Sequence, residues 1–159
     1  MGTIVVGVDG SPESKKALRW AVEEARLRGA AVRAIHVYDV PGVTWEAYAS
    51  PEGAAVTSEQ MAELEKSRQT TSADSQGRAQ ALVEHAVAEL GHTEGVRVDG
   101  AALHGRPAPK LIEESKDADL LVVGSRGRGG FTELLLGSVS HQCAQHAGCP
   151  VVILPNLRE

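Results

Sequence analysis

Two glycine-rich turns hold the residues of this sequence that are best suited to binding chemistry. Residues 124–130 place four glycines and two arginines directly after an apolar run, and residues 137–140 (Gly-Ser-Val-Ser) open a predicted helix. Glycine lets backbone N–H groups approach an anion closely, and the N-terminus of a helix carries about half a positive charge. Ser138 and Ser140 add hydroxyl donors. Together the turns predict a polyphosphate held from two sides.

The spacing of these glycines excludes two common phosphate-binding motifs. No lysine follows a glycine at the place that a Walker A loop requires, and G-x-G-x-x-G is absent because position 132 is threonine. A single G-x-x-G would predict no more than a turn after a strand. The second glycine turn, beside a helix start, is what favours an anion site.

Other polar residues give weaker signals. Asp9 precedes Gly10 at the end of the apolar run 4–8, where it suits either a ligand contact or a helix cap. The six histidines show no metal-ligand spacing, although His104 is expected near the same crevice. Cys143 and Cys149 predict neither a zinc site nor a disulfide framework. No nucleophile has an adjacent base, so catalysis has little support.

The elements that must position the glycine turns alternate between strand and helix. A stripe of small apolar residues predicts a first helix from the Ser11 cap to Gly29, and residues 39–57, rich in proline and glycine, fit no element and are interpreted as a flap or a partner contact. Continuous or alternating apolar runs predict strands at 4–8, 31–37, 96–103, 119–123 and 151–154, with further helices over 58–90, 107–115 and after Ser138.

This alternation predicts an α/β fold: an open five-stranded parallel sheet with helices on both faces, joined by right-handed crossovers. Runs 4–8 and 119–123 are the most uniformly apolar and are expected to be central, which gives the order 3-2-1-4-5. Asp9 and Gly124 then face each other at the switch point, where open α/β sheets bind ligands.

Length and charge limit the remaining possibilities. A chain of 159 residues suits one domain, expected over residues 1–155 with a short tail at 156–159. The formal net charge of −5 gives no basic footprint for nucleic acid or an anionic membrane surface. No basic leader and no run of about 18 apolar residues is present, so we expect a cytoplasmic protein without a membrane partner.

The spacing Gly124-x2-Gly127-x9-Gly137-Ser138 resembles the G-x2-G-x9-G-[ST] nucleotide signature of the universal stress protein family. The similarity extends along the chain, through the runs that begin at Ile4 and Asp119 to the one after Pro150. It implies the same Rossmann-like sheet and membership of the ATP-binding subgroup. It also implies a cofactor site for ATP, with or without Mg²⁺, made by Asp9, Val37, Val123, Gly124, Arg126, Gly127, Gly137, Ser138, Val139 and Ser140.

The function expected from these features is a nucleotide-dependent regulatory or sensor module in the stress response. The run Val151 to Leu154 has no charge and no internal proline, so as an edge strand it favours pairing with a second copy, and similar proteins form homodimers there. The alternative is a slow Mg-dependent ATPase or adenylate-transferring enzyme that uses the same pocket. A response-regulator receiver is set aside, because Ala102 and Pro155 stand where it needs aspartate and lysine.

Overall fold

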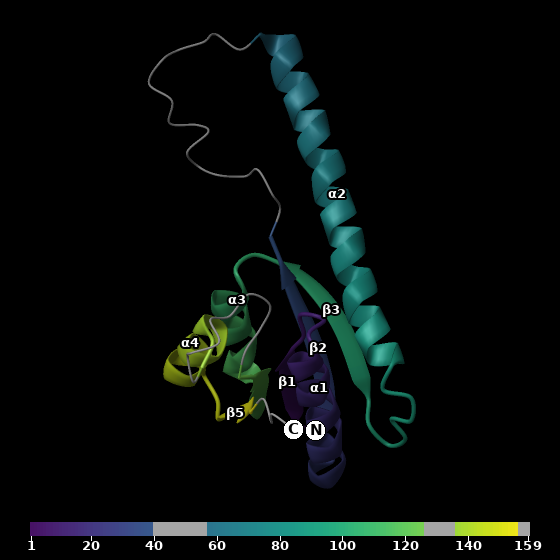
Figure 1. Cartoon of the computed structure of the whole chain (residues 1–159), viewed down its shortest axis with the longest axis vertical. Coiled ribbons are helices and arrows are strands. Elements are labelled where there is room, and N and C mark those ends of the chain that lie inside the picture. Colours follow the sequence, from purple (N-terminus) through teal and green to yellow (C-terminus); the bar gives the residue numbers. More distant parts are fainter. Residues whose placement is uncertain (40–56, 126–135, 156–159) are drawn as a thin grey trace.

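The computed structural model describes residues 1–39, 57–125 and 136–155. The predicted flap and the C-terminal tail therefore lie outside the described residues, apart from Asp39 and Thr57. Strands and helices alternate along the chain (Figure 1): β1 Thr3–Gly7, α1 Pro12–Arg28, β2 Ala31–Tyr38, α2 Ser58–Ala88, β3 Val98–His104, α3 Pro107–Glu114, the 3-10 turn η2 Ser115–Asp117, β4 Leu120–Gly124, α4 Ser138–His146 and β5 Val151–Leu154.

The sheet is parallel and has the order β3-β2-β1-β4-β5, which confirms the predicted topology. β1 is central: Ile4 pairs with Val32 of β2 on one side and with Leu120 of β4 on the other. The chain leaves β1 and β4 in opposite directions, so the switch point lies between their carboxyl ends.

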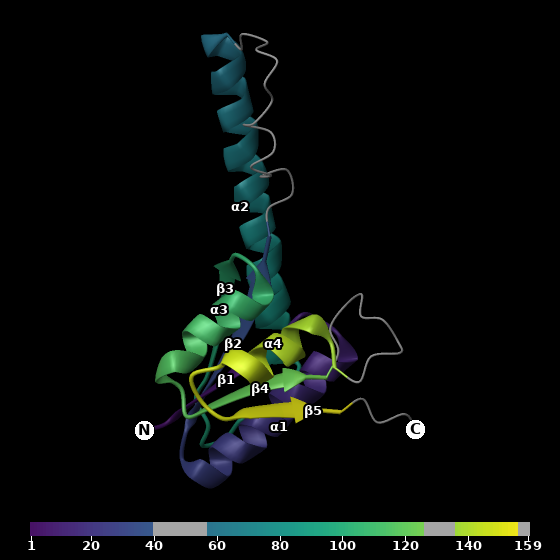
Figure 2. The ribbon, with the colours of Figure 1, turned by 90° about the vertical axis from the view of Figure 1, so that its left-hand side faces the viewer.

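Alternating side chains divide the core into two layers, as expected for strands covered on both faces. Ile4 and Val6 point to the face covered by α1 and the C-terminal part of α2. Val5 points to the opposite face, where it packs with Leu111 of α3 and Cys143 of α4. Figure 2 shows the two pairs of helices on either side of the sheet. Each strand therefore ends between two helical layers.

Helix α1 begins and ends where the sequence indicates. Ser11 caps its N-terminus by accepting a hydrogen bond from the Ser14 amide, and Pro12 occupies the first turn. Gly29 ends the helix in the left-handed region, at φ 65° and ψ 36°, which glycine adopts without steric cost.

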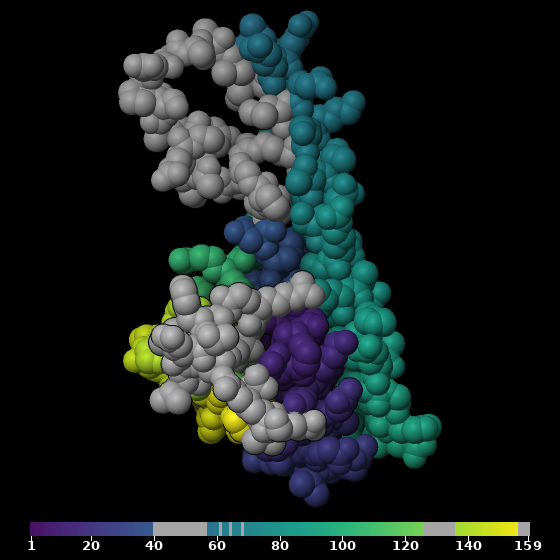
Figure 3. Space-filling view, viewed as in Figure 1, coloured from purple at the N-terminus to yellow at the C-terminus, as the bar shows by residue number. Residues whose placement is uncertain are grey.

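Helix α2 is long and only partly covered. At 1.5 Å per residue its 31 residues extend about 46 Å, well past the sheet (Figures 1 and 3). The side chains of α2 that the structure describes as buried, Ala79, Val83 and Ala86, lie in its C-terminal third. Gly100 of β3 permits close approach, since a Cβ there would lie 3.3 Å from Val83 Cγ2. No helix in the described ranges is long and apolar enough to cross a membrane.

Both cysteines are free, as the sequence indicates. Cys143 is fully buried against β4, and desolvation raises the pKa of its thiol to about 11. Burial also raises the pKa of Cys149, with the charge of Asp119 adding to the shift. Both groups are thus neutral packing residues at pH 7.

Candidate functional site

A cavity of about 400 Å³ lies at the carboxyl ends of β1, β2 and β4, the position that the topology indicates. Helices α1, α3 and α4 contribute to its walls, and Leu82 extends it to α2. Arg126 and Gly127 lie outside the described residues. The remaining expected site residues all line the cavity: Asp9, Val37, Val123, Gly124, Gly137, Ser138, Val139 and Ser140.

The N-terminus of α4 is open toward this cavity. Gly137 is its N-cap residue, at φ −68° and ψ 166°, and among the described residues no side chain caps the helix. The first amide with a carbonyl partner inside the helix is that of His141, which donates to Gly137 O. The amides of Ser138, Val139 and Ser140 precede it in the first turn, where the helix dipole favours an anion.

Ser125 joins the two glycine turns. Its carbonyl oxygen accepts from the Gly137 amide at 2.7 Å and from Ser140 Oγ at 3.0 Å, while its own amide donates to Leu154 O at 2.8 Å. Ser140 Oγ also donates to Gly137 O at 3.0 Å. The Ser140 hydroxyl was expected to face a ligand, but these two carbonyl oxygens use it. Ser140 is therefore a support for the start of α4.

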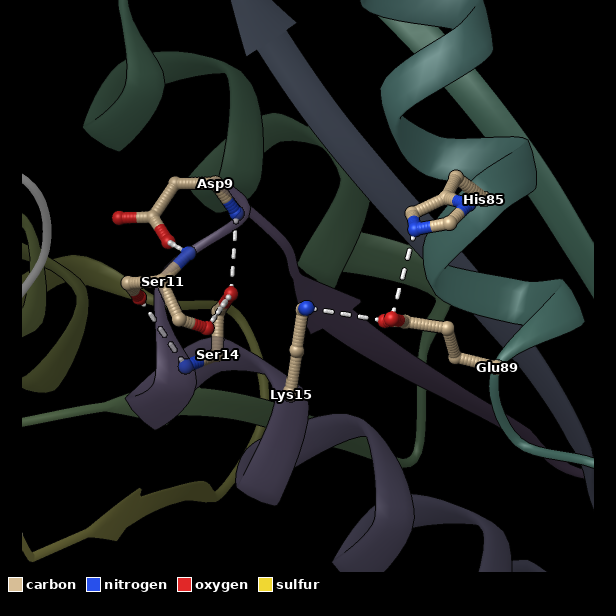
Figure 4. A network of polar contacts seen from close by, with 6 residues as sticks. All are labelled: Asp9, Ser11, Ser14, Lys15, His85 and Glu89. Carbon is tan, nitrogen blue, oxygen red and sulfur yellow. Dashed lines mark hydrogen bonds and ion pairs between the residues drawn. The ribbon is translucent and has the colours of Figure 1, made fainter.

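Asp9 belongs to a closed polar turn between β1 and α1 (Figure 4). Its Oδ1 accepts from the Ser11 amide at 2.9 Å, and its own amide donates to Ser14 Oγ at 3.2 Å. Gly10 turns the chain at φ 80°. Asp9 therefore organises the turn, and it also lines the cavity.

An ion-pair cluster beside this turn ties α1 to the end of α2 (Figure 4). Glu89 Oε2 lies 2.9 Å from Lys15 Nζ, and Glu89 Oε1 lies 3.3 Å from His85 Nε2. The hydrogen bond from Lys15 lowers the pKa of the Glu89 carboxyl, against a smaller opposing effect of desolvation. The cluster fixes the helix that carries Leu82 against the helix that follows Asp9.

His36 is a lining residue that sequence reasoning missed. Its Nδ1 lies 2.8 Å from Val8 O, at the point where β1 ends. His104, which was expected near the crevice, is not among the lining residues and packs edge-on against Tyr38 instead, with ring centroids 5.6 Å apart. The available signal was position: His36 directly precedes Val37 at the carboxyl end of β2. Further lining residues not foreseen are Gly7, Val8, Ser14, Ile35, Leu82, Pro107 and Leu111.

The chemistry of the cavity divides along the sheet edge. The β4–α4 end offers backbone amides and the Ser138 hydroxyl, whereas the β2 end is walled by Ile35, Val37, Leu82 and Leu111. Within the described ranges, no group of three or more His, Cys, Asp or Glu side chains is placed to hold a metal ion. The arrangement suits a ligand with an anionic group at one end and a flat, mostly apolar group at the other.

A parallel α/β sheet of this order, with a cavity at its switch point, is a Rossmann-like fold. Residues 1–155 match the model of the Universal stress protein family, and the chain belongs to that family. Universal stress protein Rv1996 of Mycobacterium tuberculosis is 36% identical over 156 residues, which cover 96% of this chain and 47% of the relative. The chain spans about half the length of the curated relatives it matches.

Solved structures share the fold at lower sequence identity. The hypothetical protein MJ0577 superposes with a TM-score of 0.75 at 19% identity, covering 99% of this chain and 98% of that one. A universal stress protein in complex with cAMP gives 0.61 at 23%, over 96% and 95% of the chains. An Arabidopsis thaliana family member with AMP bound gives 0.60 at 23%, over 99% and 93%.

Proposed function

We propose that this protein binds ATP in the cavity and acts as a cytoplasmic, nucleotide-dependent regulatory module of the stress response. The observation that carries the proposal is the convergence of the end of β4 and the start of α4 on one cavity, with no cap on α4 among the described side chains. Amides and a helix dipole there suit a triphosphate, and the apolar walls near β2 suit a base. The AMP and cAMP complexes of similar folds support an adenine nucleotide.

The residues fit the ligand in a simple order along the sheet edge. Gly124, Gly137 and Ser138 would hold phosphates, Asp9 would meet the ribose, and Val37 would wall the base. Asp9 is the one carboxylate among the described lining residues, so it is also the group that a Mg²⁺ ion on the phosphates would approach. Arg126 and Gly127, which belong to the first glycine turn, would also contact the phosphates.

Calorimetric titration with ATP, AMP and adenosine tests the site. If α4 holds phosphate, affinity should rise from adenosine to AMP to ATP, and the ATP affinity should fall with added salt because the contact is electrostatic. Equal affinity for adenosine and ATP would contradict the proposed orientation. Native mass spectrometry of freshly purified protein would detect any nucleotide that copurifies.

We also propose that the active form is a homodimer joined along β5. This strand is the last in the sheet and pairs with β4 alone among the described strands. Pro150 O accepts a hydrogen bond from the Leu121 amide, and Leu154 O accepts one from the Ser125 amide. The backbone groups of every second residue therefore face β4, and the N–H and C=O groups of Val151 and Ile153 point outward. An outward row of this kind is a template for a second β5 in antiparallel pairing.

A proline at position 153 tests this interface. Ile153→Pro removes an outward N–H without touching the β4 ladder, so it should shift the protein from dimer to monomer in light scattering. Ile153→Ala is the matched control, because it shortens the same side chain and keeps the amide. A monomeric wild type, or a dimer that survives the proline, would exclude pairing through β5.

A further inference from the structure

Helix α2 consists of two parts with different surroundings. Residues 79–88 pack on the sheet, where Ala79, Val83 and Ala86 are buried. Residues 58–78 project past the sheet (Figures 1 and 3), and none of their described side chains is buried. At 1.5 Å per residue the projecting part extends about 31 Å. Its described side chains therefore supply none of the apolar burial that stabilises most helices in proteins.

The packed part is held by polar contacts with two other elements. Gln80 Oε1 accepts a hydrogen bond from the Ala102 amide of β3 at 3.3 Å. Just past the end of the helix, Glu89 is paired with Lys15 of α1 at 2.9 Å. Both contacts lie after residue 78, so they hold the packed part of α2 directly and the projecting part only through the helix itself.

Weak helix formers lie where the two parts meet. Six of the eight residues from 70 to 77 are Thr, Ser, Asp or Gly. Thr loses side-chain freedom in a helix, and Ser and Asp compete for its backbone hydrogen bonds. Thr70 Oγ1 donates to Lys66 O at 3.0 Å and Thr71 Oγ1 donates to Ser67 O at 2.9 Å, a type of bond that slightly destabilises and bends helices. The helix is therefore intrinsically weak where it leaves the sheet.

Gly77 adds to this weakness although packing does not require a glycine there. Its φ is not positive, and an added Cβ would meet no described atom within 4 Å beyond its chain neighbours and its own helix backbone. Glycine is less favourable than alanine inside a helix, because it loses more backbone freedom on folding. A glycine of this kind, two residues before burial begins at Ala79, favours opening of the helix at this position.

We propose that residues 70–77 are a joint, at which the projecting part of α2 unfolds and refolds while its packed part and the sheet stay folded. Local units that open in this way are common in folded proteins. Refolding is aided at the far end of the helix, where Thr57 and Gln60 form a capping box. Leu82, through which α2 lines the cavity, lies on the packed side of the joint. The projecting part can therefore change its structure without displacing the cavity wall.

Hydrogen exchange of the full chain, measured by mass spectrometry, tests the joint. In wild type the amides of residues 62–76 should be protected less than about 100-fold, and those of residues 82–88 more than about 1,000-fold, because local opening costs less than global unfolding. Gly77→Ala should raise the protection of residues 70–76 about 5-fold, which reflects the difference in helix propensity between glycine and alanine. The same variant should leave residues 82–88 unchanged.

Two proline variants, placed four residues apart, distinguish a joint from a continuous helix. Gln76→Pro should abolish the protection of residues 62–75, but it should leave unchanged the urea concentration at which the β1 amides lose protection, because a helix tolerates proline in its first turn. Gln80→Pro is the matched control in the packed part and should lower that concentration, since it also removes the contact with Ala102.

Three results would overturn the joint. The first is equal protection of the two parts of α2 in wild type, and the second is a loss of β1 stability in Gln76→Pro as large as that in Gln80→Pro. The third is a projecting part without protection in both wild type and Gly77→Ala, because no helix would then be present to open.

Discussion

Two helices begin at the same edge of the sheet, and their N-termini are built in opposite ways. At α1 the side chains of Ser11 and Ser14 form hydrogen bonds with the backbone of the turn, which Asp9 completes. At α4 no side chain of the described part of the chain caps the helix, and the nearby hydroxyl of Ser140 is directed at carbonyl oxygens. The start of α1 is capped by side chains of its own turn, whereas the start of α4 has no such cap among the described residues.

The difference explains how the carboxyl edge of the sheet can hold a rigid turn at α1 and a binding position for an anion at α4. Amides of a helix start that lack a side-chain acceptor must be satisfied by water or by a ligand, and the dipole makes an anionic ligand the favoured one. The closed α1 turn holds Asp9 in place beside them. Substitutions that add a capping side chain to α4, or remove the one on α1, should therefore affect nucleotide affinity and stability separately.

The largest effect on ATP affinity should come from a substitution that caps the N-terminus of α4. Gly137→Asp places a carboxylate at the N-cap, where φ −68° and ψ 166° suit any residue, and it would take the amides and repel phosphate. We expect ATP affinity to fall about 100-fold or more in calorimetry, by analogy with the loss of charge-assisted contacts. Stability should stay the same or rise by a few tenths of a kcal/mol.

Gly137→Asn is the matched control, because it has the same shape without the charge. Its ATP affinity should lie between those of wild type and Gly137→Asp. If Gly137→Asp folds normally and binds ATP as well as wild type, the start of α4 is not the phosphate site.

The next largest effect, on the free energy of unfolding, should come from Ser140, whose hydroxyl holds the start of α4. Ser140 is 2% exposed, and Ser140→Ala removes the single O–H donor that Ser125 O and Gly137 O share. We expect a loss of about 1–2 kcal/mol in urea unfolding. Ser138→Ala, at an exposed position of the same helix turn, should change stability by less than about 0.5 kcal/mol and should weaken ATP binding instead. A stability loss of equal size in both variants would remove the distinction between support and ligand contact.

Removing the N-cap of α1 should have a smaller effect, and it should act on stability and not on ATP affinity. Ser11→Ala deletes the N-cap acceptor and should cost about 1 kcal/mol of stability, seen as a lower midpoint in denaturant. ATP affinity should change far less than in Gly137→Asp, since the phosphate end is untouched. Full loss of ATP binding with unchanged stability would mean that α1, and not α4, holds the phosphates.

The smallest effect concerns the ion-pair cluster beside α1. Because Lys15 lowers the pKa of Glu89 in the folded state, the cluster stabilises the protein above the ordinary carboxyl value of 4.5 and loses this effect as the pH falls through the lowered pKa. Melting curves of wild type and Glu89→Gln should differ slightly near pH 7 and converge in acid or in high salt. A difference in melting temperature between wild type and Glu89→Gln that widens in acid would contradict the stabilising role of the Lys15–Glu89 ion pair.

Much of the fold could be predicted because apolar periodicity and turn residues are local signals. The runs around Val5 and Leu121 gave the central strands, and Ser11, Pro12 and Gly29 gave the ends of α1. Strand β3 begins at Val98, two residues later than predicted, since Val96 is held in a turn by a bond from its amide to Thr93 O. Element ends depend on such bonds more than on composition.

The candidate site was predicted unevenly for a related reason. Glycine turns and their spacing can be recognised in a sequence, so Gly124, Gly137 and Ser138 were identified in advance. His36 was missed, because nothing local distinguishes a histidine at a strand end from any other. The use of the Ser140 hydroxyl was also misjudged, since one of its two acceptors, Ser125 O, lies on a separate turn.

The sequence by itself determined the alternation of strands and helices and the two glycine turns, because these depend on residues near one another in the chain. It also indicated the strand order, because the two most uniformly apolar runs, 4–8 and 119–123, are those buried at the centre of the sheet. Only the tertiary structure decided which polar atoms remain available. Ser125 O lies 15 residues from Ser140, and Val8 O lies 28 residues from His36. Those bonds form only when the strands and helices pack together, and they hold the start of α4 and the ring of His36 in place beside the cavity that α4 and β2 both line.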